Sequence, residues 1–106
     1  MDPAALEPLL GKSSDAREAS GLDPKTYELV RLATLIALDG SPTSFVWEVR
    51  DAQRAGVSEK ELFGLLVAVA STVGSPRIVS AAAEIWFALA DADLSDREGG
   101  GTDGQP

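Results

Sequence analysis

The chain has 106 residues, which is enough for one domain with one hydrophobic core and too few for two. Hydrophobic residues make up 44% and charged residues 25% of it, as in ordinary globular domains and unlike disordered or membrane-spanning chains. Cysteine and histidine are both absent, which excludes disulfides, thiol nucleophiles, the commonest transition-metal ligand and the usual neutral-pH base. Catalysis would therefore depend on carboxylates, hydroxyls, backbone groups or a borrowed cofactor.

The net charge of −8 argues against nucleic-acid binding, because phosphate contacts need clustered basic residues and the nine Lys and Arg are scattered. Five acids and one base lie in residues 91–106, so half of the excess charge belongs to a solubilising tail. The N-terminus lacks a basic segment followed by an apolar one, and no apolar run approaches the length of a membrane span. We expect a cytoplasmic protein that binds neither nucleic acid nor membrane.

Residues 1–21 are expected to form an N-terminal extension with two possible short helical stretches, Pro3 to Leu10 and Asp15 to Ser20. The first long helix opens at Asp23-Pro24, where an N-cap acceptor precedes a proline in the first helical position, and it runs to Asp39 with Gly40 as a left-handed stop. Its apolar residues recur at intervals of three and four, which predicts a wide buried stripe. They are Leu29, Val30, Leu32, Ala33, Ile36 and Ala37.

The second long helix opens at Ser41-Pro42 and ends at Gly56, with Phe45, Val49 and Ala52 on its buried face. The third begins with the capping box of Ser58 and Glu61, in which each side chain accepts from the other residue's backbone amide.

The third helix then runs without charge from Leu62 to Val73 and stops at Gly74. Its β-branched residues would also suit a buried strand, but its length and caps favour a helix. A helix that is apolar all round is buried all round, and so small a chain has few elements to cover it. We expect other copies of the chain to provide the cover.

The fourth helix begins at Ser75-Pro76 and continues to about Asp91, and the acidic, glycine-rich residues beyond Leu94 are expected to be disordered. The sequence therefore predicts an all-α fold. We expect a compact bundle of four main helices plus short N-terminal helical segments, assembling as a homo-oligomer. The expected organisation is an N-terminal extension (1–21), a helical domain (22–92) and a disordered acidic tail (93–106).

Three stretches carry a resemblance to a known family: Leu-Asp-Pro-Lys-Thr-Tyr-Glu-Leu-Val (22–30), Arg-Ala-Gly-Val-Ser-Glu-Lys-Glu-Leu (54–62) and Val-Gly-Ser-Pro (73–76). In this order and spacing, the region from Leu22 to about Leu89 resembles the carboxymuconolactone decarboxylase and alkylhydroperoxidase D-like family. The resemblance implies an all-helical subunit that forms trimers or hexamers, with an active site near the subunit contacts.

The peroxidase branch of that family carries Cys-x-x-Cys-x-x-x-His at the start of the second helix. Matching that motif here puts Ser41 and Ser44 on the cysteine positions and Glu48 on the histidine position, with Glu28 on the position of a relay glutamate. The decarboxylase branch keeps the histidine, so Glu48 departs from that pattern as well. Because a hydroxyl cannot cycle through sulfenic acid and disulfide, we exclude cysteine peroxidase activity.

Glu48 and Glu28 are the candidate catalytic residues. If they converge in an apolar cleft, their mutual repulsion would raise one pKa and supply an acid-base pair. The alternative is structural: Glu48 would be solvated or ion-paired, and Glu28 would interact favourably with the positive end of its helix.

The candidate binding residues are Ser41, Ser44, Trp47 and Arg50. The two serines share a helical face with Glu48, Trp47 would line an apolar pocket, and Arg50, like Arg31 or Arg77, would clamp a carboxylate. Each also has a structural reading: helix cap for Ser41, first-turn support for Ser44, core or subunit contact for Trp47 and ion pair for Arg50.

The leading hypothesis is a family member without the redox centre that works as a homo-oligomeric small-ligand-binding or scaffold protein. The alternative is a cofactor-independent lyase or isomerase that uses Glu48 on a small carboxylated or lactone substrate. A third reading is an inert assembly partner of a catalytically complete relative. The expected partners are other copies of the chain and a small apolar or carboxylated ligand. Without a phosphate loop, metal-ligand cluster or catalytic triad in the sequence, we expect no cofactor and no metal.

Overall fold

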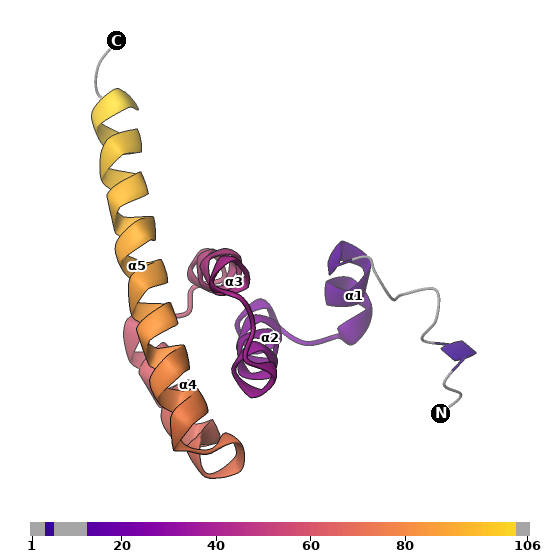
Figure 1. Ribbon diagram of the computed structural model, residues 1–106. Coiled ribbons are helices and arrows are strands. Elements are labelled where there is room, and N and C mark those ends of the chain that lie inside the picture. The colour runs from indigo at the N-terminus through magenta and orange to yellow at the C-terminus, as the bar shows by residue number, and fades with distance from the viewer. Residues whose placement is uncertain (1–3, 6–12, 104–106) are drawn as a thin grey trace.

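A computed structural model describes residues 4–5 and 13–103 of the chain. It shows an all-α protein (Figure 1). The described residues form five α-helices: α1 (Ser13–Ser20), α2 (Pro24–Leu38), α3 (Pro42–Arg54), α4 (Glu59–Val73) and α5 (Ser75–Asp103). Ala4 and Ala5 have 3₁₀ geometry, and the described residues include no strand. The predicted fold class is therefore confirmed. None of the helices in these parts of the chain combines the length and the apolar character that crossing a membrane requires.

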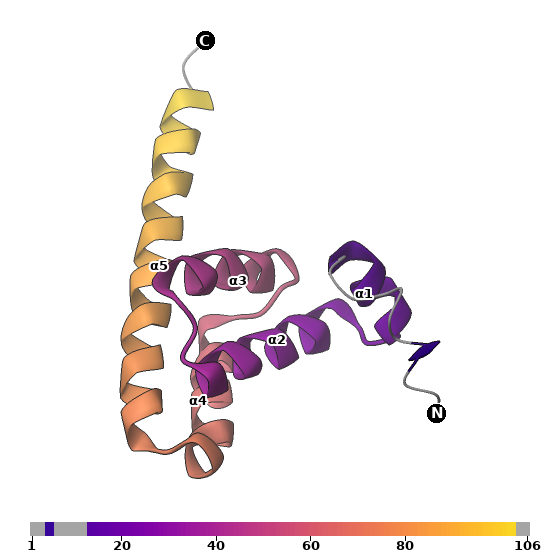
Figure 2. The same cartoon turned by 45° about the vertical axis from the view of Figure 1, so that its right-hand side comes forward.

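The helices form two crossed layers (Figures 1 and 2). α4 and α5 run side by side as an antiparallel pair, and α2 and α3 lie next to each other across it. α3 packs most extensively against α5, and among the described residues α1 packs against α2. The α2–α3 pair is where the candidate residues of the site come together.

The predicted helix starts are confirmed by the cap hydrogen bonds. Asp23 Oδ1 accepts from the Thr26 amide at 3.2 Å, and Ser41 Oγ accepts from the Ser44 amide at 3.2 Å. At the start of α4 both bonds of the capping box form: the Glu61 amide donates to Ser58 Oγ at 3.1 Å, and the Ser58 amide donates to Glu61 Oε1 at 2.9 Å. These bonds satisfy backbone amides that have no partner within the helix.

The end of α2 differs from the prediction. The left-handed residue is Asp39, with φ 54° and ψ 56°, and Gly40 does not have a positive φ. Aspartate is one of the residues that tolerate this conformation. Gly40 has a steric role instead, because a Cβ there would lie 2.9 Å from Cδ2 of Leu35.

Both ends of the chain also depart from the predicted boundaries. α1 begins at Ser13 rather than Asp15, and most of the expected helix from Pro3 to Leu10 lies outside the described residues. α5 does not stop near Asp91 but continues to Asp103, so the part of the expected disordered tail up to that residue is helical. Asp91 is held by Arg50 of α3 at 3.1 Å and Ala92 is buried, so packing carries the helix past its expected end. Propagation then adds one hydrogen bond per residue.

The core lies where the two layers meet. Its largest fully buried side chains are Leu32, Ile36, Phe45, Val49, Leu62 and Ile85. The predicted inner face of α3 is confirmed, since Phe45, Val49 and Ala52 are at most 2% exposed. The expected all-round burial of α4 does not occur within one chain: only Leu62 and Leu66 of this helix are buried, while Phe63 is 60% and Val67 is 62% exposed.

Replacing Ser58 by alanine is expected to lower the free energy of unfolding by about 1 kcal/mol, because the substitution removes the N-cap acceptor of α4. Urea unfolding followed by circular dichroism measures this loss. Ser80→Ala is the matched control, since Ser80 is exposed within α5 and makes no cap. An equal loss in both variants would contradict the role of the capping box.

Candidate functional site

The two candidate catalytic glutamates converge between α2 and α3. Glu28 on α2 is 3% exposed and Glu48 on α3 is 4% exposed, although both are acidic. Asp51, one turn after Glu48, joins them, and one carboxylate oxygen from each of the three lies within 4.8 Å of the others. The geometric condition for an acid-base pair is therefore met.

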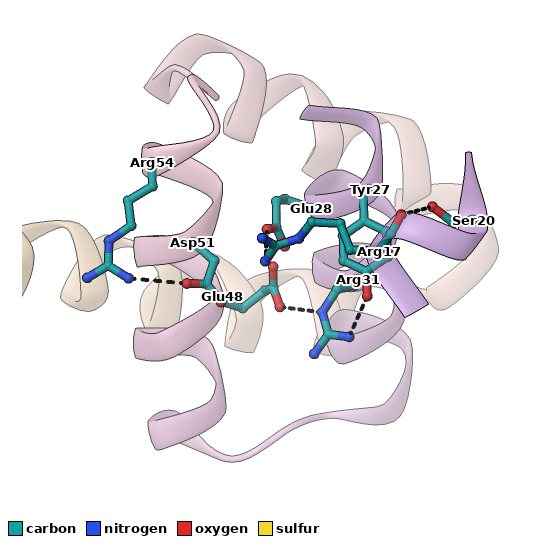
Figure 3. A network of polar contacts seen from close by, with 8 residues as sticks. All are labelled: Arg17, Ser20, Tyr27, Glu28, Arg31, Glu48, Asp51 and Arg54. Atoms are coloured by element: carbon teal, nitrogen blue, oxygen red, sulfur yellow. Dashed lines mark hydrogen bonds and ion pairs between the residues drawn. The ribbon is translucent and has the colours of Figure 1, made fainter. Parts of the chain in front are cut away.

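Each carboxylate of this cluster has an arginine partner (Figure 3). The pairs are Arg31 Nε with Glu48 Oε1 at 2.9 Å, Arg17 Nη2 with Glu28 Oε2 at 3.4 Å, and Arg54 Nη1 with Asp51 Oδ1 at 3.5 Å. The arginine side chains are 45 to 72% exposed, so the cations lie toward water and the two glutamates lie inside. The pairs compensate much of the cost of burying the carboxylates.

Tyr27 holds two of these arginines in place. The guanidinium carbons of Arg17 and Arg31 lie 5.7 and 5.6 Å from the centroid of its ring, a cation-π distance. Arg31 Nη1 also donates a hydrogen bond to the Tyr27 hydroxyl at 3.3 Å. This buried tyrosine therefore positions Arg31 beside Glu48 and Arg17 beside Glu28.

Burial raises the pKa of Glu48 from its ordinary 4.5 to about 7, and the neighbouring Glu28 carboxyl adds to the rise while Arg31 opposes it. Among the described residues, Glu28 Oε1 and Glu48 Oε2 are buried without a hydrogen-bond partner. A proton held between the two carboxyl groups would supply the missing hydrogen bond. Glu48 is therefore arranged to keep its proton close to neutral pH.

The cluster is less suited to a metal ion. Three carboxylates are the hard oxygen ligands that Mg²⁺ and Ca²⁺ prefer. Here, however, Arg17, Arg31 and Arg54 neutralise the cluster, and their charges oppose a divalent cation. The arrangement favours proton chemistry.

A cleft of about 500 Å³ opens beside Glu48. It is lined by Val30, Arg31, Thr34 and Leu35 from α2 and by Ser44, Trp47, Glu48 and Asp51 from α3. Trp47 is 58% exposed, so within one chain it is a wall of the cleft rather than a core residue. A smaller cleft of about 330 Å³, lined by Arg17, Glu28 and Asp51 among others, reaches the pair from the side of Glu28.

Two of the predicted binding residues are not among those that line the cleft. Ser41 caps α3 and lies 2.9 Å from Ser44 through the two hydroxyls. Arg50 pairs with Asp91 at 3.1 Å and lies 5.9 Å from the Trp47 ring, so it ties α3 to α5. The arginine at the cleft is Arg31.

Sequence reasoning missed Arg17, Tyr27, Asp51 and Arg54 as members of this network. A signal existed for Asp51, because it follows Glu48 by three residues and helical residues at this spacing are neighbours. No signal existed for Arg17, since its approach to Glu28 depends on how α1 packs against α2.

Comparison with known proteins adds a family match. A model of the carboxymuconolactone decarboxylase family matches residues 3–98. The match is longer than the region of resemblance found in the sequence and extends over α1 and into the second half of α5. Searches of curated proteins and of solved structures gave no match.

Proposed function

The chain belongs to the carboxymuconolactone decarboxylase family, and on that premise we propose that it is a non-redox member in which Glu48 moves a proton on a small carboxylated or lactone substrate. The absence of cysteine removes the dithiol chemistry of the peroxidase branch. The observation that carries the proposal is the position of Glu48, which is buried against Glu28 and lines the α2–α3 cleft. This is a cofactor-independent lyase or isomerase.

The pair supplies the acid and the base. A general acid works best with a pKa near the working pH, and the pKa of Glu48 is raised to about 7. In a lyase reaction, a substrate carboxylate leaves as carbon dioxide and protonated Glu48 delivers its proton to the carbon left behind. In an isomerase reaction, ionised Glu48 takes a proton from one carbon and returns it to another.

Arg31 and Glu28 support Glu48 in this proposal. Arg31 lines the cleft with a 45% exposed side chain, and a guanidinium recognises a carboxylate by paired hydrogen bonds. The neighbouring Glu28 carboxyl adds to the raised pKa of Glu48, and the smaller cleft beside Glu28, bordered by Arg17, leads to solvent. Proton exchange on that side would leave the substrate in the larger cleft undisturbed.

The test is an activity screen with carboxylated lactones and small unsaturated acids. Glu48→Gln is expected to reduce turnover by at least about 100-fold, because it removes the transferable proton while keeping the side-chain shape. Glu59→Gln, on the exposed start of α4, serves as the control and should retain full turnover. Unchanged turnover in Glu48→Gln would remove Glu48 from the mechanism.

The second candidate function, a homo-oligomeric binding or scaffold protein, is favoured by large exposed apolar side chains on α4 and α5. On α5 they recur at helical spacing on one side, and on α4 they are four residues apart. They are Val79 (70% exposed), Trp86 (56%), Phe87 (67%) and Leu94 (58%) on α5, and Phe63 (60%) and Val67 (62%) on α4. Contiguous apolar patches on a protein surface mark interaction sites. We propose that copies of the chain pack against each other here.

Light scattering after size exclusion is expected to give a mass of several subunits for the wild type. A charge placed in an apolar contact is costly, so Phe87→Glu should lower that mass. Thr43→Glu, at an exposed position of α3 outside this surface, is the control and should leave the mass unchanged. A monomeric wild type at high concentration would rule out this assembly.

A further inference from the structure

An apolar groove between α2 and α4 adjoins the α2–α3 cleft. Val30 and Thr34 line both hollows, so the two meet along α2. The groove has a volume of about 460 Å³, and apart from Thr34 and Thr72 its lining consists of Ala, Val and Leu side chains. The Thr34 hydroxyl is already engaged, because it donates to the Val30 carbonyl at 2.9 Å. The groove therefore suits an apolar chain and not a polar one.

The cleft, the more polar of the two adjoining hollows, suits an anion. Arg31 donates through Nε to Glu48 and through Nη1 to Tyr27, and within the described part of the chain its Nη2 donates no hydrogen bond. The charged groups that face one another here are Arg17 on α1, Glu28 and Arg31 on α2, and Glu48, Asp51 and Arg54 on α3. When the glutamate pair keeps one proton, two negative charges face three positive ones. One anion would balance the network.

We propose that the cleft and the α2–α4 groove form a single binding site for an amphipathic carboxylate, with its carboxylate on Arg31 and an unbranched apolar tail along Ala37 and Val69. This names the ligand class of the proposed function and rests on its assignment of ligand binding to the cleft. The tail, rather than a second copy of the chain, occupies the groove. Ala68 and Thr72 of the groove lie on the other side of α4 from Phe63 and Val67, judged by the helical period.

Calorimetric titration with acetate, hexanoate, octanoate and octanol at pH 6 tests the site. Burial of each added methylene should increase affinity by about two- to fourfold until the groove is filled. Octanol should bind at least about tenfold more weakly than octanoate, because it lacks the charge that Arg31 recognises. Equal affinities for acetate and octanoate, or for octanol and octanoate, would overturn the proposal.

Two variants locate the tail. Ala37→Phe, which fills the groove without touching the cleft lining, should weaken octanoate binding about tenfold and leave acetate binding unchanged. Ala19→Phe, at an exposed position of α1, is the matched control and should change neither. Should Ala37→Phe change the subunit number in light scattering and not the dependence on chain length, a second copy fills the groove and the proposal is wrong.

The outcomes separate this proposal from the proposed reaction. Glu48→Gln keeps Arg31 and the groove, so octanoate should still bind to this variant. If the wild-type protein binds octanoate but turns over no substrate, the binding site is supported and the proposed reaction of Glu48 is wrong. If short substrates are turned over but a longer apolar tail does not increase affinity, the proposed reaction is supported and the proposed binding site is wrong.

Discussion

The free energy of unfolding is expected to fall by about 2 kcal/mol as the pH rises from about 5 to about 8, the reverse of what an ion-paired glutamate with a lowered pKa would cause. The folded protein holds the Glu48 proton up to a pKa of about 7, whereas the unfolded chain releases it near 4.5. Unfolding therefore releases a proton between these values. The stabilisation is complete below pH 4.5 and is lost as the pH rises through about 7.

The pH range from about 5 to about 8 contains few other titrations that would obscure that of Glu48. The chain has no histidine and no cysteine, so few other groups titrate between pH 5 and 8. Lys25, at 2.8 Å, and then the Ser58 amide lower the pKa of Glu61 to about 2. That contribution is present above pH 4.5 and is lost as the pH falls toward 2, outside the window.

Urea unfolding at a series of pH values between about 5 and about 8 measures this change in the free energy of unfolding. Glu48→Gln should flatten the profile, since an amide does not titrate, and Glu59→Gln should keep the slope of the wild type. Stability that rises with pH in the wild type would contradict the raised pKa and, with it, the assignment of the shared proton.

The second expected result concerns the helix that carries Glu28 and Arg31. Leu32→Ala should lower the free energy of unfolding by about 3 kcal/mol, because Leu32 is fully buried and its loss leaves a cavity. Leu38→Ala, the same substitution on the same helix at a residue that is 72% exposed, should change it by less than about 0.5 kcal/mol.

Thermal or urea unfolding of both variants tests which face of α2 packs into the core. Similar losses for Leu32→Ala and Leu38→Ala would mean that α2 does not face the core in the way described. In Leu32→Ala the Glu28–Glu48 pair should also loosen, which would reduce the pH dependence of stability.

Local signals in the sequence were sufficient for most of the fold. Three helix starts were predictable from the local sequence, because their cap hydrogen bonds join residues that are three apart. They are Asp23-Pro24, Ser41-Pro42 and the Ser58–Glu61 capping box. The inner face of α3 followed from the spacing of Phe45, Val49 and Ala52.

The misplaced boundaries depend on contacts that a local pattern does not contain. The continuation of α5 past Asp91 is supported by the Arg50–Asp91 pair, which joins residues 41 apart in sequence. The steric role of Gly40 depends on the position of the Leu35 side chain. The exposed side of α4 reflects how few helices one short chain has to cover it.

The candidate site was predicted in part for the same reason. Helix periodicity assigns Glu28 and Glu48 to a face of each helix, but it does not show which faces of the two helices meet. The sequence could therefore not predict whether the two glutamates converge. The choice among arginines could not be made, and the structure brings Arg31 rather than Arg50 to the cleft.

The projecting end of α5 has a practical consequence. With 29 residues at about 1.5 Å each, α5 is about 40 Å long, and its C-terminal half extends past the crossing helices (Figures 1 and 2). A fluorophore or surface anchor attached to that end would stand well clear of Arg31 and the groove. Immobilisation through this end would leave the site open to ligand, whereas attachment near α1 would crowd Arg17.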